Sequence, residues 1–416
     1  KKVNWTFWKK RDGNNPLILE WIDSIIFAVI AVSLINIFIF QNYKIPTPSM
    51  EKTMMVGDYL YVSKMAYGPR IPNTPVAVPF TQNVLPFVKN VKPYSEIVKI
   101  SYNRLAGFGK IMRDDIVVFN FPEGDTVILS APSNVTYYSV VRDSADKLLM
   151  RDMLSGIPQK TEMEYYSKAG KAVRLHSDIA FRPVDKRDNY VKRCVAIPGD
   201  SMQIINAKLY RNGIPQDDLA GIQLGYIIFM EEGKRISDQV FESMGIHNVQ
   251  HAGNIMVTSL THDEYKEISS LNGVEKVILN SVYDRYYKDF FPHDTNYHWT
   301  LNNFGPLYIP EKGASIPINL KNLCLYARII TSYEKNTLEI RGDRIYINDI
   351  EADTYTFKMN YYWMMGDNRH NSLDSRFWGF VPEDHIIGKP KLVWLSLEAN
   401  KKFPEKIKWD RLFRTF

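Results

Sequence analysis

The chain has very few cysteines, and this scarcity excludes two common ways of stabilising a fold. Its 416 residues contain only Cys194 and Cys324. Two cysteines are too few for a disulfide framework, and so wide a separation does not have the ligand spacing of a zinc site. We therefore expect no metal and no other cofactor, and the two cysteines give no information about the compartment of the protein.

The sequence also lacks the motifs of several hydrolases and a concentrated basic segment. None of its eight histidines stands in an H-E-x-x-H motif, and no serine stands in G-x-S-x-G, so neither a zinc protease nor a nucleophile elbow is indicated. The formal net charge is +6, but lysine and arginine are spread along the chain, and no zinc-finger or RNA-binding motif accompanies them. We expect no nucleic-acid partner.

What the chain does contain is a long apolar run near its N-terminus. Residues 24–40, SIIFAVIAVSLINIFIF, carry no charge, and Trp21 precedes them as an interfacial aromatic residue would. This pattern predicts a transmembrane helix over residues 21–41, preceded by an N-terminal segment of residues 1–20. A buried helix of a soluble protein and a cleaved signal peptide are the alternatives, but no cleavage site of small residues follows cleanly.

The charges around this run predict its orientation. Positive residues concentrate on the cytoplasmic side of a transmembrane helix, so the richer flank should be cytoplasmic. The N-terminal segment would then be cytoplasmic, and everything after residue 41 would lie on the outer side of the membrane. The basic residues before the run are Lys1, Lys2, Lys9, Lys10 and Arg11, whereas only Lys44 and Lys52 follow it closely.

After the apolar run, short β-rich segments alternate with turn residues, which predicts a mainly β fold. Two hairpins are expected after Lys208 and Arg344, because Asn-Gly and Asn-Asp pairs separate their strands. One β domain would be interrupted by less patterned segments. We expect its first part over residues 42–213, with a small insertion at about 134–186, an inserted second lobe over 214–335, its second part over 336–398, and a C-terminal tail over 399–416.

The segment IPTPSMEK places Ser49 in a proline-bounded turn shortly after the apolar run. A serine nucleophile needs a base that removes its proton, and a lysine can replace histidine if burial lowers the lysine pKa from about 10.4 toward neutrality. Two lysines are candidates for this base. One is Lys52, three residues after the serine, and the other is Lys192.

Lys52 completes an S-x-x-K motif of the kind found in penicillin-binding proteins and β-lactamases. In those enzymes the pair lies on a long buried helix, whereas here a Gly-Asp pair interrupts the chain after about two turns. Their K-T-G motif is also absent from this sequence. We expect Lys52, which follows Glu51, to be a solvated charge, and an acyltransferase of this type remains the alternative.

Lys192 lies in the apolar segment YVKRCVAIPGD, which predicts a β-strand. Strand alternation would direct Lys192 and Cys194 to one face, and Val191 and Arg193 to the other. Such a strand could bury an amine. Composition alone nevertheless favours a surface lysine on an edge strand, and that alternative stays open.

A third segment, residues 364–388, reads MMGDNRHNSLDSRFWGFVPEDHIIG and is dense in Asp, Asn, Arg and Ser. So many paired donors and acceptors after an apolar strand predict a hydrogen-bonded support for a site. A capped turn in which Asp374 pairs with Arg376 is the simpler interpretation, and it is compatible with a supporting role.

The three segments together resemble the bacterial type I signal peptidases, membrane proteases with a Ser-Lys dyad that remove signal peptides from exported proteins. The nucleophile motif P-x-x-S-M matches residues 46–50, and K-R-x-x-x-x-P-G-D matches residues 192–200. The motif G-D-N-R-x-x-S-x-D-S-R matches residues 366–376, and the strand R-G-D-I-V-V-F fits from Arg113. The order of the motifs and the membrane anchor match as well.

The resemblance implies roles for particular residues. Ser49 would be the nucleophile and Lys192 the general base. Thr47 would assist the backbone N–H of Ser49 in the oxyanion hole, and Ser372 would hydrogen-bond the amine of Lys192. The supporting residues would be Asp374, Arg376 and Arg193, and the small substrate pockets would be lined by Met50, Met54 and Val191.

The resemblance also implies partners for this chain. The partners would be the signal peptides of preproteins and membrane lipid, and the oligomeric state stays open. A catalytically idle, membrane-tethered interaction module, with residues 214–335 as its working surface, is the remaining alternative.

The sequence also departs from the family pattern. The departures are Pro48 for a common glycine, Lys52 for the usual proline, Asp114 for a glycine and His370 for an aspartate.

Overall fold

The computed structural model describes residues 16–85, 91–132, 135–158, 161–217, 219–285, 287–399 and 401–416. The chain divides into two compact units, and every predicted site residue belongs to the second. The first unit comprises Lys1–Asn42, Tyr61–Lys110 and Gly124–Asp188, and the second comprises Tyr43–Leu60, Ile111–Glu123 and Asn189–Phe416.

The first unit contains the apolar helix α1 (Leu17–Phe38), which is long and apolar enough to cross a membrane. Its 22 residues have a mean hydropathy of 2.2, and none of its residues is buried in the fold. At about 1.5 Å per residue, this length matches a hydrocarbon core of about 30 Å. The helix begins and ends earlier than the predicted segment 21–41. Its earlier end follows from strand β1 (Phe40–Lys44), which the chain enters directly after the helix.

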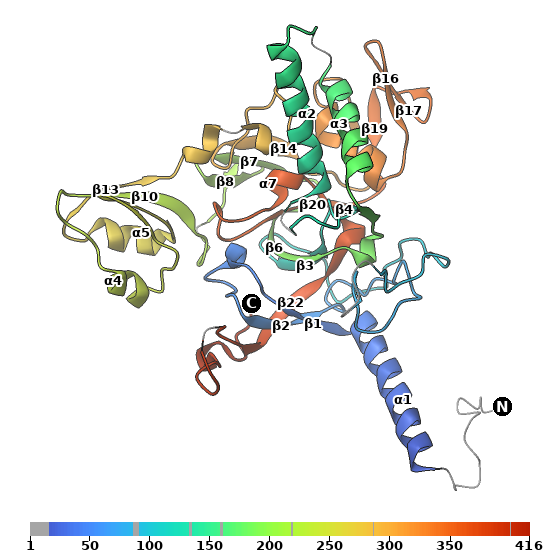
Figure 1. Cartoon of the computed structure of the whole chain (residues 1–416), viewed down its shortest axis with the longest axis horizontal. Helices are drawn as coiled ribbons and strands as arrows, with labels where there is room; N and C mark the ends of the chain where they lie inside the picture. Colours follow the sequence, from blue (N-terminus) through green and yellow to red (C-terminus); the bar gives the residue numbers. More distant parts are fainter. Residues whose placement is uncertain are drawn as a thin grey trace. The chain divides into compact units, whose positions relative to one another are not determined.

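The region expected as a small insertion, 134–186, contains a helical hairpin. Helices α2 (Tyr137–Leu154) and α3 (Glu162–His176) lie side by side in Figure 1 and share one apolar cluster. Each helix begins with a capping box, in which Thr136 or Thr161 accepts a hydrogen bond from the third residue of the helix. The short strands β4 (Thr126–Ile128) and β5 (Ile179–Phe181) pair at the ends of this region.

A seven-stranded sheet organises the second unit, which confirms the prediction of a mainly β fold. Strands β1 and β2 belong partly to each unit. The order across the sheet is β1, β2 (Asp58–Ser63), β22 (Ile386–Ser396), β3 (Ile116–Asn120), β6 (Asn189–Ala196), β20 (Tyr361–Met365) and β21 (Val381–Pro382).

The interior position of β6 in this sheet decides the environment of Lys192. Strand β6 lies between β3 and β20, so it is not an edge strand. Lys192 is opposite Val117 of β3, and all five residues of β3 are buried. A strand such as IVVFN, covered on both faces, reads as a continuous apolar run. The alternative of a lysine on an exposed edge strand is therefore wrong.

Both predicted hairpins are present. Strand β8 (Lys208–Arg211) turns into β9 (Ile214–Pro215), and β17 (Arg344–Ile347) turns into β18 (Ile350–Glu351). The two turn residues of each hairpin have positive φ, at 53° and 78° in the first and 52° and 64° in the second. Asn-Gly and Asn-Asp pairs tolerate this backbone, which is why the sequence signal was reliable.

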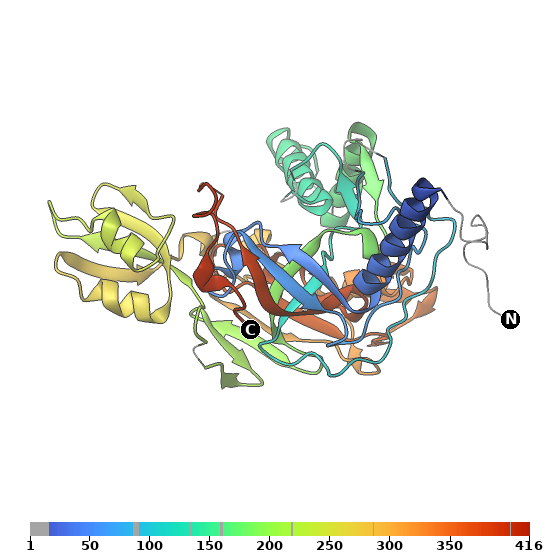
Figure 2. The same ribbon diagram turned by 90° about the horizontal axis from the view of Figure 1, so that it is seen from below.

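A smaller β sheet with two helices forms a separate apolar cluster within the second unit, and we call it the inserted lobe. Its strands are β11 (Gln250–Ala252), β12 (Ile255–Leu260), β10 (Leu224–Met230) and β13 (Val274–Leu279). Figures 1 and 2 show α4 (Asp238–Ser243) and α5 (His262–Ser269) gathered with this sheet, and both helices contribute to its core.

The inserted lobe is narrower than the predicted range 214–335. Residues of β14 (Phe304–Tyr308) and α6 (Leu323–Arg328) pack instead in the main core, together with Trp363 of β20. Those residues therefore complete the body that carries the site. Further elements of this unit are β7 (Ser201–Ile205), β15 (Ser315–Pro317), η5 (Ile329–Tyr333), β16 (Leu338–Arg341), β19 (Thr354–Thr356) and α7 (Ser375–Trp378).

Candidate active site

Ser49 lies in a single tight turn, η1 (Pro48–Met50), and is buried. Proline at the first position of this turn fixes φ, and the N–H of Glu51 donates to the carbonyl of Pro48 to close it. The carbonyl of Ser49 accepts a hydrogen bond from the N–H of Asn368 at 3.1 Å. Backbone hydrogen bonds, one within the turn and one from Asn368, therefore fix the serine turn without any contribution from side chains.

The amine of Lys192 donates a hydrogen bond to Oγ of Ser49 at 2.6 Å. Only 3% of the lysine is exposed, and burial lowers the pKa of Lys192 to about 8, although the carboxylates of Asp374 and Asp367 oppose the shift. About one molecule in ten would then carry the neutral amine at pH 7. A neutral lysine next to a serine hydroxyl is a competent general base.

The two residues predicted to assist this pair are placed differently. Oγ1 of Thr47 lies 3.5 Å from Oγ of Ser49. Ser372 is buried, but its Oγ has no hydrogen-bond partner among the described residues, so its expected bond to Lys192 is not formed. Gly366 explains how these segments approach: a Cβ there would lie 2.2 Å from Oγ of Ser372 and 2.5 Å from the carbonyl oxygen of Ser49.

Asp374 and Arg376 form a fully buried ion pair behind these groups. The guanidinium binds the carboxylate at 2.9 Å through Nε and at 2.8 Å through Nη2. Burial would raise the pKa of Asp374, but the charge and hydrogen bonds of Arg376 hold it below its ordinary value. The carboxylate also accepts the N–H of Gly366 at 3.0 Å, so the pair fixes the segment that touches the serine turn.

Arg193 makes a second ion pair of this kind on the opposite face of β6. Its Nε and Nη2 bind the buried carboxylate of Asp367 at 2.7 and 2.6 Å. Asp367 also accepts the hydroxyl of Thr53 at 2.6 Å, so it connects the strand of the lysine to the segment that follows the serine. Arg193 was predicted as a supporting residue and Asp367 was not, although the position of Asp367 in the G-D-N-R motif was a usable signal.

The three residues expected to line the substrate pockets differ in exposure. Met50 and Met54 are fully buried at 1% and 0%, and Val191 is half-buried. The methionines therefore support the serine turn from within the fold, and the pocket role of all three stays a prediction.

Comparison with known proteins decides the family. A family model described as "Signal peptidase, peptidase S26" matches residues 18–255 and 318–395, which is most of the chain. The chain belongs to the signal peptidase family. The members of this family are serine endopeptidases. The chain is therefore a serine endopeptidase that removes signal peptides.

Several signal peptidases resemble the chain over most of its length. A signal peptidase I of Buchnera aphidicola subsp. Acyrthosiphon pisum is 21% identical over 97% of this chain and 83% of its own length. A signal peptidase I of Haemophilus influenzae is 23% identical over 95% and 74%. A signal peptidase I of Aquifex aeolicus is 52% identical, but over only 11% of this chain and 18% of its own length.

Lys52 differs from the signal peptidase pattern and has an unexpected role. Its Nζ pairs with Oε1 of Glu264 at 2.6 Å and donates to the carbonyl of Gly245 at 2.7 Å. The side chain is 19% exposed, so the expectation of a solvated charge is wrong. The cause is helix α5 of the inserted lobe, which brings Glu264 to the serine segment. This amine is engaged by the lobe, which removes support from the S-x-x-K alternative.

Backbone conformation clarifies the departures from the signal peptidase motifs at Lys52 and at Asp114. Lys52 has φ of 68°, which proline cannot adopt, so the backbone here cannot match a segment with proline at this position. Asp114 has φ of 70°, a conformation natural for the glycine usually found there. Its carboxylate binds Arg211 at 3.0 Å and Gln216 at 2.7 Å, so the aspartate also has a structural use.

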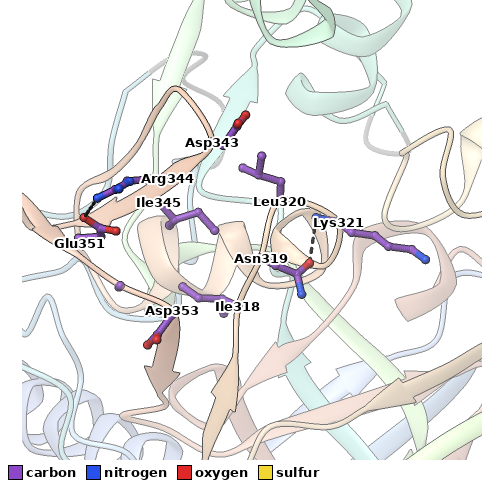
Figure 3. A pocket seen from close by; sticks show the side chains of 10 residues that line it. Ile318, Asn319, Leu320, Lys321, Asp343, Arg344, Ile345, Glu351 and Asp353 are labelled. Atoms are coloured by element: carbon purple, nitrogen blue, oxygen red, sulfur yellow. Dashed lines mark hydrogen bonds and ion pairs between the residues drawn. The ribbon is translucent and has the colours of Figure 1, made fainter.

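A pocket of about 700 Å³ elsewhere in the second unit does not have the chemistry of a peptidase site (Figure 3). Residues 318–321, 343–345 and 351–353 line it, and two of these residues, Arg344 and Glu351, form an ion pair at 2.9 Å. No serine or buried lysine lines it. Within the described part of the chain, no group of three or more His, Cys, Asp or Glu side chains could hold a metal ion.

Proposed function

We propose that Ser49 and Lys192 perform signal-peptide removal by this chain through an acyl-enzyme. Oγ of Ser49 attacks the carbonyl carbon of the last signal-peptide residue, and Lys192 accepts the hydroxyl proton. The lysine then donates this proton to the leaving amine, and water hydrolyses the ester with the lysine again as base. The observation that carries this proposal is the buried hydrogen bond of 2.6 Å between the two side chains.

The neighbouring residues have positioning roles in this proposal. The N–H of Ser49, assisted by the hydroxyl of Thr47, would stabilise the oxyanion. Ser372 would hold the neutral amine of Lys192 toward the serine once substrate is bound, and its unpartnered hydroxyl supports this role. The pairs of Asp374 with Arg376 and of Arg193 with Asp367 would brace the segments that carry these groups.

The substrate class follows from the family, and the specificity within it is part of the proposal. The substrates are preproteins with signal peptides. Small pockets formed near Met50, Met54 and Val191 would accept alanine one and three residues before the cut and exclude bulky side chains by overlap.

The proposal also places the second unit on the outer side of the cytoplasmic membrane, held at a lipid surface by α1. The helix has the length and composition of a span, and the positive charges before it favour a cytoplasmic N-terminus. Ser49 follows the end of α1 at Phe38 after a short segment, which would keep the serine near the membrane where signal peptides are exposed.

A cleavage assay tests the catalytic assignment. Purified full-length protein in detergent should cut a model preprotein at one bond, and Ser49→Ala and Lys192→Arg should each abolish the cut while circular dichroism stays unchanged. Lys192→Arg is the sharper variant, because arginine keeps the charge but offers no free lone pair. Cutting by either variant would refute the dyad, and labelling of Ser49 by a simple penicillin would instead support the acyltransferase alternative.

Protease accessibility tests the orientation, and it does so independently of catalysis. In spheroplasts, externally added protease should digest the C-terminal portion of the chain and spare an N-terminal tag. Protection of the C-terminal portion would contradict the proposed side of the membrane. Retention of the biological role by Ser49→Ala would favour the interaction-module alternative.

A further inference from the structure

Arg369 carries a buried positive charge without a partner. The residue is 4% exposed, and its Nε and Nη2 are enclosed without a hydrogen bond to any described atom. Its backbone is fixed, because its N–H donates to the carbonyl of Gln223 at 2.9 Å and its carbonyl accepts from Arg376. Buried polar groups are nearly always hydrogen-bonded, and a buried charge is nearly always paired.

The carboxylates near Arg369 are already occupied by other groups. Asp367 binds Arg193 and Thr53, and Asp374 binds Arg376. Burial and the charge of Arg376 lower the pKa of Arg369 to about 10, which still leaves it protonated at neutral pH. This cluster therefore holds three guanidinium groups and two carboxylates, and the surplus charge belongs to Arg369.

Arg369 lines a cavity of about 150 Å³ that lies between the inserted lobe, strand β8 with the turn before it, and the segment after β9. Its lining combines the apolar side chains of Leu209, Ile222, Leu224 and Leu260 with polar and charged residues, among them Lys208, Gln216, Asp217 and His262. Neither Ser49 nor Lys192 lines it, so it is distinct from the proposed catalytic pair. Its volume is smaller than the roughly 300 Å³ at which pockets begin to hold drug-sized ligands, so its occupant would be small.

We propose that this cavity binds a short organic carboxylate with an apolar body. A guanidinium pairs strongly with a carboxylate, which would give Arg369 the negative partner that no described residue supplies. The leucine and isoleucine side chains would cover an alkyl group of a few carbons. Inorganic phosphate has no alkyl group to cover these apolar side chains, so it should bind more weakly than such a carboxylate.

Two groups of the chain itself are the competing partners. Asp217 lines the same cavity and is exposed, and no ion pair joins it to Arg369. Oε1 of Gln223 is buried without a partner, but a neutral amide cannot balance the charge. If Asp217 were the natural partner of Arg369, removal of its charge would open a carboxylate site that the unmodified protein lacks.

Ligand titration of the full-length protein in detergent tests the proposal. At constant ionic strength, hexanoate should raise the melting temperature in a saturable way, whereas hexanamide and inorganic phosphate should not. N-acetyl-leucine represents the carboxyl end of a peptide. Stronger binding of this compound than of hexanoate would assign the site to a peptide terminus, and the reverse order would assign it to a free acid.

Variants complete the test. Arg369→Gln should weaken hexanoate binding at least tenfold, and Leu224→Phe, which fills the cavity and keeps the charge, should do the same. Lys234→Gln, at an exposed cation of the inserted lobe that does not line the cavity, should change binding less than twofold. The proposal is overturned by equal effects of hexanoate and hexanamide, by phosphate binding as strong as hexanoate binding, by unchanged binding in both cavity variants, or by binding that appears only in Asp217→Asn.

Discussion

The amine of Lys192 lies 2.6 Å from the hydroxyl oxygen of Ser49, and both residues are buried. Burial does two things at once here. It excludes water from the hydrogen bond, and it lowers the pKa of Lys192 to about 8. The same interaction therefore has a consequence for catalysis and a consequence for stability, and each can be measured separately.

The catalytic consequence is a dependence on pH. Only the neutral amine accepts the proton of Ser49, so the cleavage rate should rise with pH and level off above about 8. The measurement is kcat/KM for a model preprotein between pH 6 and pH 9.5, at pH values where circular dichroism shows an intact fold. A rate that is constant across this range would contradict the assignment of Lys192 as the base.

The consequence for stability comes from the charged form of Lys192, which the folded protein disfavours. The folded pKa of about 8 lies below the ordinary 10.5, so the folded state binds fewer protons between these values and stability rises with pH. Below pH 8 the charged lysine costs on the order of 3 kcal/mol. Lys192→Met should therefore be more stable than the unmodified protein at pH 7, and its advantage should disappear as pH approaches 10.5.

Urea unfolding at pH 7 and pH 10 measures this difference directly. Lys389→Met is a suitable control, because Lys389 is paired with Asp115 and is only partly buried. It should not reproduce the stabilisation at pH 7. Equal stability of Lys192→Met and the unmodified protein at pH 7 would show that the buried amine carries no such cost.

The buried pair of Arg193 and Asp367 gives a prediction about the frame of the site. Asp367 is 0% exposed and Arg193 is 11% exposed, so Asp367→Asn leaves a buried guanidinium without its charge partner. Loss of one member of a buried pair costs about 3 to 5 kcal/mol in the free energy of unfolding. The control is Glu351→Gln, at a pair that is 67% and 51% exposed, where about 0 to 1 kcal/mol is expected. Similar losses in the two variants would count against a structural role for Asp367.

Short sequence motifs contain most of the predicted site residues. Contacts between distant segments could not be predicted from the sequence. Ser49, Lys192 and Asp374 each lie in a short motif that singled them out, and their roles stay a prediction. The partner of Lys52 was not predictable, because Glu264 belongs to a lobe whose position on the serine segment depends on many packing contacts. The lobe was also predicted too wide, since α6 and β14 look irregular in sequence but pack into the main core.

Gly366 provides a test of how closely the catalytic segments approach. In Gly366→Ala the new Cβ would overlap the carbonyl oxygen of Ser49, which is backbone and cannot rotate away. We expect the cleavage rate to fall about 100-fold, as a displacement of about 1 Å at a catalytic group can cause. The double variant with Ser372→Ala should not recover, because the clash with Ser49 remains. Gly170→Ala is the control, since its Cβ would meet no atom closer than 3.5 Å. A Gly366→Ala enzyme with ordinary activity would show that the segments lie further apart.

The ion pair of Lys52 with Glu264 predicts that the inserted lobe and the serine segment are energetically coupled. Its side chains are 19% and 13% exposed, so the pair is partly shielded from solvent and should contribute about 1 kcal/mol of coupling in a double-mutant cycle of Lys52→Ala and Glu264→Gln. The matched pair within the lobe, Lys234 with Glu231, is 47% and 51% exposed and should show a coupling near zero. Because Lys52 follows Ser49 by three residues, Lys52→Ala should also lower kcat more than it raises KM. A cycle with no coupling for Lys52 and Glu264, measured by urea unfolding, would mean that the lobe does not hold the serine segment.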